Sequence, residues 1–195
     1  MNFPLNLSFK ILALASQIHV QDASGTTIAY VKQKLLKLRE DIDVFADQSQ
    51  TSLLYNIKAD RVIDFSARYN FTDGSGKALG SVKRQGMRSL WKAHYEVSDA
   101  GGTLVMNIRE ENVWVRVWDS LFGELPFIGM LSGYLFHPAY VVTDSQGQML
   151  ARLVKQPAFF EGKFQLDKQP ALQSKDETLV LLSMLTMTLL ERARG

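Results

Sequence analysis

The chain has 195 residues and a mass of 22.0 kDa, which is the size of a single domain. It contains no cysteine, so disulfides, thiolate metal ligands and thiol nucleophiles are excluded, and the cytoplasm is the expected compartment. The formal net charge is +2, with 46% hydrophobic and 22% charged residues. This composition is typical of a globular protein, and the small net charge argues against nucleic acid as a partner.

Three apolar stretches bear on targeting and membranes. Residues 11–15 form an apolar run of only five residues, and no charge precedes Lys10, so the segment does not fit a secretory signal. We expect it to form or lead into a first strand. The uncharged run 178–190 is shorter than the roughly 20 residues that a spanning helix needs. The run 125–143 is interrupted by proline and glycine. We therefore expect no transmembrane span.

A short motif recurs along the chain, consisting of an apolar residue, a spacer and an aspartate, followed in four of five copies by a glycine three residues later. Aspartate accepts hydrogen bonds from the backbone two residues on, and glycine supplies the positive φ that closes a hairpin. Each copy therefore predicts a turn between two strands. Calcium binding is the alternative, but single carboxylates in separate turns cannot supply six to eight oxygen ligands. The aspartates are Asp22, Asp47, Asp73, Asp99 and Asp144.

Runs rich in β-branched and aromatic residues lie around these turns and predict about twelve strands. Regular antiparallel hairpins in this number favour a barrel or a sandwich, and closure into a barrel removes exposed edges. The predicted strands are 18–21, 26–33, 41–46, 52–58, 62–72, 77–84, 91–98, 103–110, 112–118, 138–143, 149–155 and 158–166.

The last segment decides between barrel and sandwich. Ser174 to Glu177 matches a capping box, with Ser174 as N-cap and Glu177 reaching back to it, and predicts a helix over residues 175–192. This helix has no polar stripe, because only three small hydroxyl residues interrupt its apolar surface. A helix that is apolar on all sides and too short for a bilayer must be surrounded by protein. The alternative, a helix packed on one sheet face, would keep a solvent-facing stripe.

We therefore predict a mainly β fold, a closed antiparallel barrel of about twelve strands around a hydrophobic C-terminal helix. The chain is expected to form one domain over residues 1–195, with an apolar insertion at 119–138 that breaks the repeat. The insertion has two interpretations: a lid over a barrel mouth, or an exposed patch for a protein partner or a membrane. The lid is favoured, because so apolar a patch promotes aggregation of a soluble monomer.

With these features the chain resembles the LURP-one-related branch of the tubby C-terminal-like superfamily, which also includes the phospholipid scramblases. The resemblance is carried by the Val/Phe-x-Asp-x-x-Gly turns, by strands such as 28–32 and 79–83, and by the closing apolar helix. It covers residues 7–192. It implies a non-enzymatic domain often linked to membranes or phosphoinositides, and tubby proteins are also proposed as transcription regulators. No acidic calcium-binding segment of the scramblase type and no tubby phosphoinositide motif can be matched.

The residues themselves predict no catalytic or metal site. His19, His94 and His137 have no metal-ligand spacing, and no G-x-S-x-G sequence marks a nucleophilic serine. We expect a protein that is not an enzyme and that needs no cofactor and no metal.

Basic residues gather at the strand ends opposite the aspartate turns. In an up-and-down barrel, alternate connections share an end, so one end should carry the aspartates and the other should be positive. The bases expected there are Lys32, Lys34, Lys58, Lys83, Arg84, Arg109 and Lys155.

The densest basic run is 83–92, which contains no acid and has apolar residues suited to shallow insertion into an anionic surface. The alternative is a solvated connection whose tryptophan is turned inward. The function we expect is a cytoplasmic or peripheral-membrane binding domain for anionic phospholipid headgroups. The alternative is a protein-interaction or structural module that uses residues 119–138. The predicted headgroup-binding residues are Lys83, Arg84, Arg88, Trp91 and Lys92.

Overall fold

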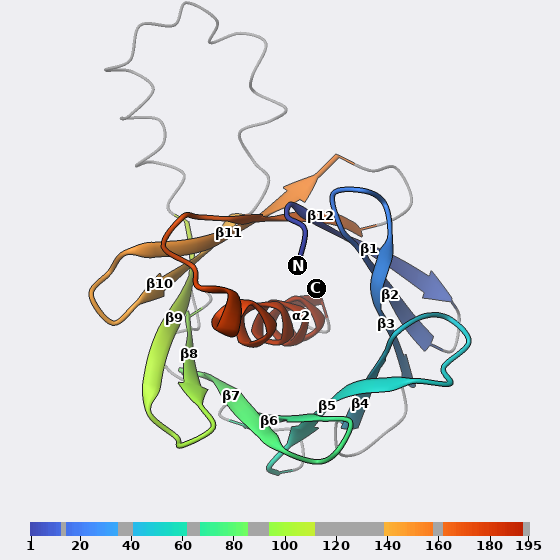
Figure 1. Ribbon diagram of the computed structural model, residues 1–195, viewed down its shortest axis with the longest axis horizontal. Helices are drawn as coiled ribbons and strands as arrows, with labels where there is room; N and C mark the ends of the chain where they lie inside the picture. The colour runs from blue at the N-terminus through green and yellow to red at the C-terminus, as the bar shows by residue number, and fades with distance from the viewer. Residues whose placement is uncertain are drawn as a thin grey trace, which may run out of the picture.

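The fold is a closed antiparallel barrel of twelve strands with one α-helix inside it (Figure 1). Each strand pairs with its neighbours in the chain, and the first strand pairs with the twelfth to close the barrel. The mainly β fold predicted from the sequence, with its enclosed C-terminal helix, is confirmed. The computed structural model describes residues 1–12, 15–34, 41–61, 67–85, 94–111, 139–157 and 162–192.

The strands are β1 (Leu5–Leu12), β2 (Ala15–Gln21), β3 (Thr27–Lys34), β4 (Asp41–Phe45), β5 (Leu53–Ala59), β6 (Arg68–Asp73), β7 (Ala78–Arg84), β8 (His94–Asp99), β9 (Leu104–Glu110), β10 (Ala139–Asp144), β11 (Met149–Gln156) and β12 (Gly162–Lys168).

The observed strands differ from the predicted set at two places. The N-terminal segment provides β1, which was expected only to form or lead into a strand. The predicted strand 112–118 lies outside the described residues, as does the insertion 119–138. The barrel closes without 112–118, because β9 pairs directly with β10 and brings Glu110 opposite Tyr140.

Four of the five aspartate turns have a common geometry. In the first turn, the Asp22 carboxylate accepts hydrogen bonds from the backbone N–H groups of Ser24 and Thr26, at 2.9 and 3.0 Å. Asp73, Asp99 and Asp144 repeat both bonds. The predicted hairpin turns are therefore confirmed.

The turn at Asp47 differs because it has no glycine. Its carboxylate accepts one backbone hydrogen bond, from Ser49, and Gln50 adopts the positive φ of 57° that glycine takes in the other copies.

All five turns lie at the same end of the barrel, because the connections alternate between the two ends. We call this end the aspartate end. It faces the viewer in Figure 1 together with the start of the helix.

The helix α2 (Glu177–Arg192) follows a short 3₁₀ turn, η2 (Ser174–Asp176). Residues 179–189 are all buried, which confirms that protein surrounds the helix. The hydroxyls of Thr186 and Thr188 donate to the carbonyls of Leu182 and Met184 one turn earlier. The helix runs closest to β7 and β8. Gly80 of β7 makes room for it, because a Cβ there would lie 2.7 Å from Leu179 Cδ1.

The predicted capping box is wrong. Ser174 begins the 3₁₀ turn, and Gln173 before it makes no side-chain capping bond. The carboxylate of Glu177 instead binds the N-terminal ammonium group at 2.7 Å and Lys168 Nζ at 2.5 Å. Its side chain is only 5% exposed, and a buried carboxylate is better stabilised by two cations than by a neutral backbone N–H group.

Candidate functional site

Lys83 and Arg84, the two predicted headgroup-binding residues that the structure describes, fall on different sides of the barrel wall. Lys83 and Arg84 are neighbours in β7, and side chains alternate between the two faces of a strand. Lys83 is half-buried and lies opposite Glu96 of β8. The Arg84 side chain is 8% exposed, and its guanidinium group lies 3.5 Å from Glu191 Oε1 of the helix. Arg88, Trp91 and Lys92 lie outside the described residues.

Arg84 belongs to a buried polar cluster at the end of the helix. Its guanidinium carbon lies 5.8 Å from the centre of the Tyr95 ring, and the Tyr95 hydroxyl donates to Glu191. Burial, followed by the nearby Glu191 and Glu110 charges, raises the pKa of Tyr140 to about 12. Burial and the Glu191 bond also raise the pKa of Tyr95. Both phenols therefore remain protonated at neutral pH, and the cluster joins the helix to the wall.

Four other bases predicted for the end opposite the aspartate end are exposed to solvent, and one of them lies near a carboxylate. Lys32, Lys58, Arg109 and Lys155 are exposed, but Lys58 Nζ lies 3.9 Å from Asp41 Oδ2. The Lys34 side chain and the connections between strands at this end lie outside the described part of the chain. The net positive charge of this end therefore stays a prediction.

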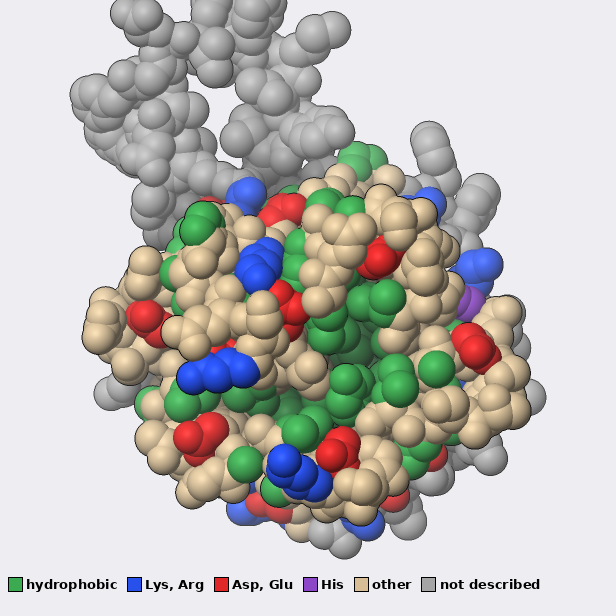
Figure 2. Space-filling view, viewed as in Figure 1, with side chains coloured by type: hydrophobic (Ala, Val, Ile, Leu, Met, Phe, Trp, Pro, Cys, Tyr) green, Lys and Arg blue, Asp and Glu red, His purple; other side chains and the backbone are tan. Residues whose placement is uncertain are grey.

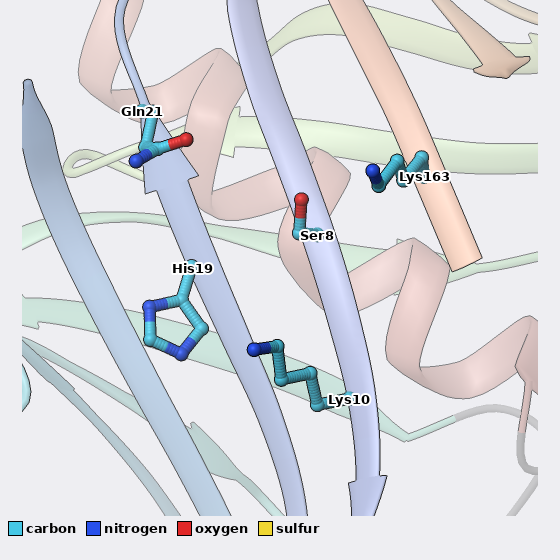
Figure 3. A pocket seen from close by; sticks show the side chains of 5 residues that line it. All are labelled: Ser8, Lys10, His19, Gln21 and Lys163. Atoms are coloured by element: carbon cyan, nitrogen blue, oxygen red, sulfur yellow. The ribbon is translucent and has the colours of Figure 1, made fainter. Parts of the chain in front are cut away.

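A basic pocket lies on the outer wall where β12, β1 and β2 run side by side (Figure 3). Its volume is about 210 Å³. The register of the sheet places Lys163, Ser8 and His19 in one row across the three strands. These side chains point outward because their neighbours in the strands, such as Leu7 and Ile18, are fully buried in the core. The lining residues are Ser8, Lys10, His19, Gln21 and Lys163.

Two lysines supply the charge of the pocket, and no acidic residue of the described ranges lines it. In Figure 3 the ammonium group of Lys10 extends toward β2 and that of Lys163 toward β1. Gln17 of β2 lies between Lys10 and Lys32 in the next row, so a third lysine is two strands away, at about 10 Å for a strand spacing near 4.8 Å. The wall is therefore locally cationic.

His19 is held in a defined orientation at the edge of this pocket. Its ring packs edge-on against Tyr30, with 4.9 Å between ring centres. Its Nε2 lies 3.3 Å from the side-chain amide nitrogen of Gln48. An amide nitrogen can only donate, so Nε2 is the acceptor in this contact.

The pocket is suited to binding a compact oxyanion. The lysine ammonium groups, the Ser8 hydroxyl and the Gln21 amide are hydrogen-bond donors, and bonds from cations to anionic oxygens are stronger than neutral ones. The described residues hold no group of three side chains that could bind a metal ion. Sequence reasoning missed this pocket, because Ser8 and Lys163 are far apart in the chain and become neighbours only when β1 pairs with β12.

No helix in the described part of the chain is long and apolar enough to cross a membrane.

Residues 27–122 match the model of the LURP-one-related family. The matched segment covers about half of the chain and extends from β3 past β9. No curated protein matches the chain. The resemblance predicted from the turns, strands and helix is thus confirmed for this segment, whereas all five residues of the outer-wall pocket lie outside it.

Proposed function

We propose that this LURP-one-related barrel is a non-catalytic domain that docks to anionic phospholipid headgroups, with the outer-wall pocket as one contact site. The observation that carries the proposal is the pair Lys10 and Lys163 in one pocket that no acidic residue of the described chain lines. A phosphate or carboxylate of a headgroup would find two cations and two neutral donors there. Each base near an anionic surface contributes about 1 kcal/mol, so such docking is weak and sensitive to salt.

The placement of the pocket in the barrel supports an orientation on the membrane. Lys10 lies toward the end of β1 and Lys163 near the start of β12, so both lie toward the end opposite the aspartate end. β7 ends and β8 begins at this same end, and the basic run 83–92 joins them. An anionic bilayer would attract this end and repel the aspartate end. In this proposal Lys83, Arg88, Trp91 and Lys92 contact the same surface, whereas Arg84 stays inside the barrel.

Vesicle flotation tests the proposal. We expect the protein to float with vesicles of phosphatidylcholine and phosphatidylserine, but not with phosphatidylcholine alone, and recovery should fall as salt is added. The variant Lys10→Gln/Lys163→Gln should bind anionic vesicles about thirty-fold more weakly, since two lysines at about 1 kcal/mol each correspond to that factor. The matched control is Lys77→Gln/Lys175→Gln, which removes two exposed lysines from the aspartate end.

Four outcomes would contradict the proposal. Equal recovery with neutral and anionic vesicles would exclude headgroup charge as the determinant. Equal weakening by the pocket variant and the control would show that only net charge matters. Binding of inorganic phosphate without any vesicle binding would identify a free anion as the ligand. Binding that is lost only when residues 119–138 are replaced would favour the protein-interaction module instead.

A further inference from the structure

Each aspartate hairpin contains a β-bulge next to its turn. In the first hairpin, Val20 lies opposite Ala29 and the following residue, Gln21, lies opposite Thr27, so Ile28 is the extra residue. The same register shift recurs in the other four hairpins. A bulge inserts one residue into a strand and redirects its side chain. All five extra residues are apolar: Ile28, Leu54, Leu79, Val105 and Leu150.

These bulge residues contribute to an apolar mouth at the aspartate end. Leu150 belongs to the core, and Ile28, Leu79 and Val105 pack against it while remaining partly exposed. Figure 2 shows a hollow lined with hydrophobic side chains at this end of the barrel. The hollow does not continue as a cavity along the described wall, since interior residues such as Leu5, Ile18 and Val44 have no exposed surface.

Exposed apolar side chains continue this surface onto the hairpins. Leu53, Leu104 and Met149 each precede a bulge residue, and they are 40%, 45% and 38% exposed. Thr27 occupies the same position in the first hairpin, so a polar residue is compatible with the geometry. Together with Met1, these three are the exposed large hydrophobic residues of the described chain, and all lie at the aspartate end.

The charge around this apolar mouth is mainly negative. Each aspartate uses one carboxylate oxygen, Oδ1, to bind the turn backbone. A neighbouring serine hydroxyl, together with backbone N–H groups, lowers the pKa of Asp22, Asp47 and Asp73, which keeps them ionised. The cations Lys168 and the N-terminal ammonium group are bound to Glu177. The exposed lysines of this end, Lys77 and Lys175, are fewer than the five aspartates.

We propose that the aspartate end is the docking surface for a segment of a partner protein that carries apolar side chains flanked by lysine or arginine. The apolar side chains would cover the mouth, with its surrounding Leu53, Leu104 and Met149, and the flanking cations would approach the aspartate carboxylates. A second copy of this end is a poor occupant, because two rings of aspartates would meet. An anionic bilayer is repelled for the same reason. This surface is separate from the outer-wall pocket.

Synthetic peptides of equal length test this surface by fluorescence anisotropy. One probe has a leucine-rich centre with lysine flanks, the second has glutamate flanks, and the third replaces the leucines by serine. We expect only the first to bind, with affinity that decreases as salt is added. The variant Leu53→Gln/Leu104→Gln/Met149→Gln, which changes only exposed side chains, should weaken binding at least tenfold.

A second variant tests the charge without altering any turn aspartate. Ala100→Lys/Gln146→Lys adds two cations at exposed turn positions and should also weaken binding at least tenfold. The matched control, Asn70→Lys/Asn107→Lys, adds the same charge in mid-strand positions on the wall and should bind as the native protein does. Neither mouth variant should change vesicle flotation, which separates this proposal from the proposed headgroup docking.

Either of two results would overturn the proposal. The first is that the lysine-flanked and glutamate-flanked peptides bind equally, or that the native protein and the triple glutamine variant bind the lysine-flanked peptide equally. The second is a dimer in light scattering that the triple variant abolishes, because a second copy would then cover the surface.

Discussion

Glycine is needed at two kinds of position in this barrel, for different physical reasons. Gly76 has a φ of +87° in a hairpin turn, and a Cβ there would meet nothing within 4 Å. Gly80 has a φ of +150° within β7, and a Cβ there would lie 2.4 Å from the carbonyl oxygen of Ser98. The first position requires only backbone freedom. The second also requires empty space, because a Cβ there would meet both the backbone of β8 and Leu179 of the helix.

The two glycines should therefore respond differently to alanine. Gly76→Ala should lower the free energy of unfolding by about 1–2 kcal/mol, the cost of a left-handed conformation. Gly80→Ala should cost more, since about 1–3 kcal/mol of overpacking adds to a similar backbone strain. Urea denaturation of both variants measures the difference. An equal loss in the two variants would contradict the close approach of Leu179 to β7.

Glu177 should make stability depend on acid pH. Burial raises the pKa of its carboxyl group, but the bonds from Lys168 and the N-terminal ammonium group outweigh this, so the net shift is downward from the usual 4.5. A lowered folded-state pKa contributes stability above the unfolded value, and this contribution is lost as the pH falls below about 4.5. Glu177→Gln should lower the free energy of unfolding by about 1–3 kcal/mol at pH 7. This loss should become progressively smaller as the pH falls below about 4.5.

Denaturation curves across the acid range check this prediction, with Asp176→Asn as the control at the adjacent position. A Glu177→Gln penalty that stays constant down to the lowest pH would show that the charge of the carboxylate is not what stabilises the mouth.

At the scale of the element, α2 is a buried helix that still carries hydroxyl groups. Thr186 and Thr188 satisfy theirs on carbonyls of the preceding turn. The Ser183 hydroxyl oxygen is buried and has no hydrogen-bond partner among the described residues. An unsatisfied buried hydroxyl is destabilising, because folding removes its bonds to water without replacement.

Two substitutions in this helix should therefore have different effects on the free energy of unfolding. Ser183→Ala should leave the unfolding free energy unchanged or raise it by up to about 1–3 kcal/mol. Leu182→Ala, at a fully buried neighbour, should lower it by about 2–5 kcal/mol through the cavity that it leaves. Thermal and urea denaturation of both variants provide the comparison. A clear loss of stability in Ser183→Ala would show that its hydroxyl has a partner.

At the scale of the whole molecule, the barrel and its helix share one core. The same cluster contains wall residues such as Val82 and Tyr95 and helix residues such as Leu181 and Leu185. Neither part can bury its apolar face without the other, so the folding of wall and helix should be one cooperative event.

Removal of residues 178–195 should consequently yield an insoluble chain, because the apolar interior of the wall would face water. The variant Leu182→Ala, which keeps the helix, should remain soluble and serves as the control. Size-exclusion chromatography and circular dichroism measure the outcome. A soluble truncated chain with cooperative unfolding would contradict the shared core.

Much of this architecture follows from local rules that the sequence displays directly. The Asp-x-x-Gly turns are visible because their hydrogen bonds join residues two to four positions apart. The enclosed helix is visible because residues 179–190 have no polar stripe, which permits few environments. From these two signals the hairpins, the barrel and its central helix could be predicted.

Features that depend on distant partners could not be predicted in this way. Glu177 was expected to cap its own helix, but it binds Lys168 and the N-terminal ammonium group, which the closed barrel brings to its mouth. Arg84 was expected on the surface beside Lys83. Side chains alternate between the two faces of β7, however, and that of Arg84 lies on the inner face, near Glu191.

The sequence by itself determined the turns, the number of hairpins and the need to enclose the last helix, because each depends on neighbouring residues or on a single periodicity. Only the tertiary structure decided the strand register, the pairing of β1 with β12 and hence the pocket between Ser8 and Lys163. The physical reason is that a shift of one residue in register exchanges the inner and outer faces of a strand, and closure alone makes the two ends of the chain neighbours.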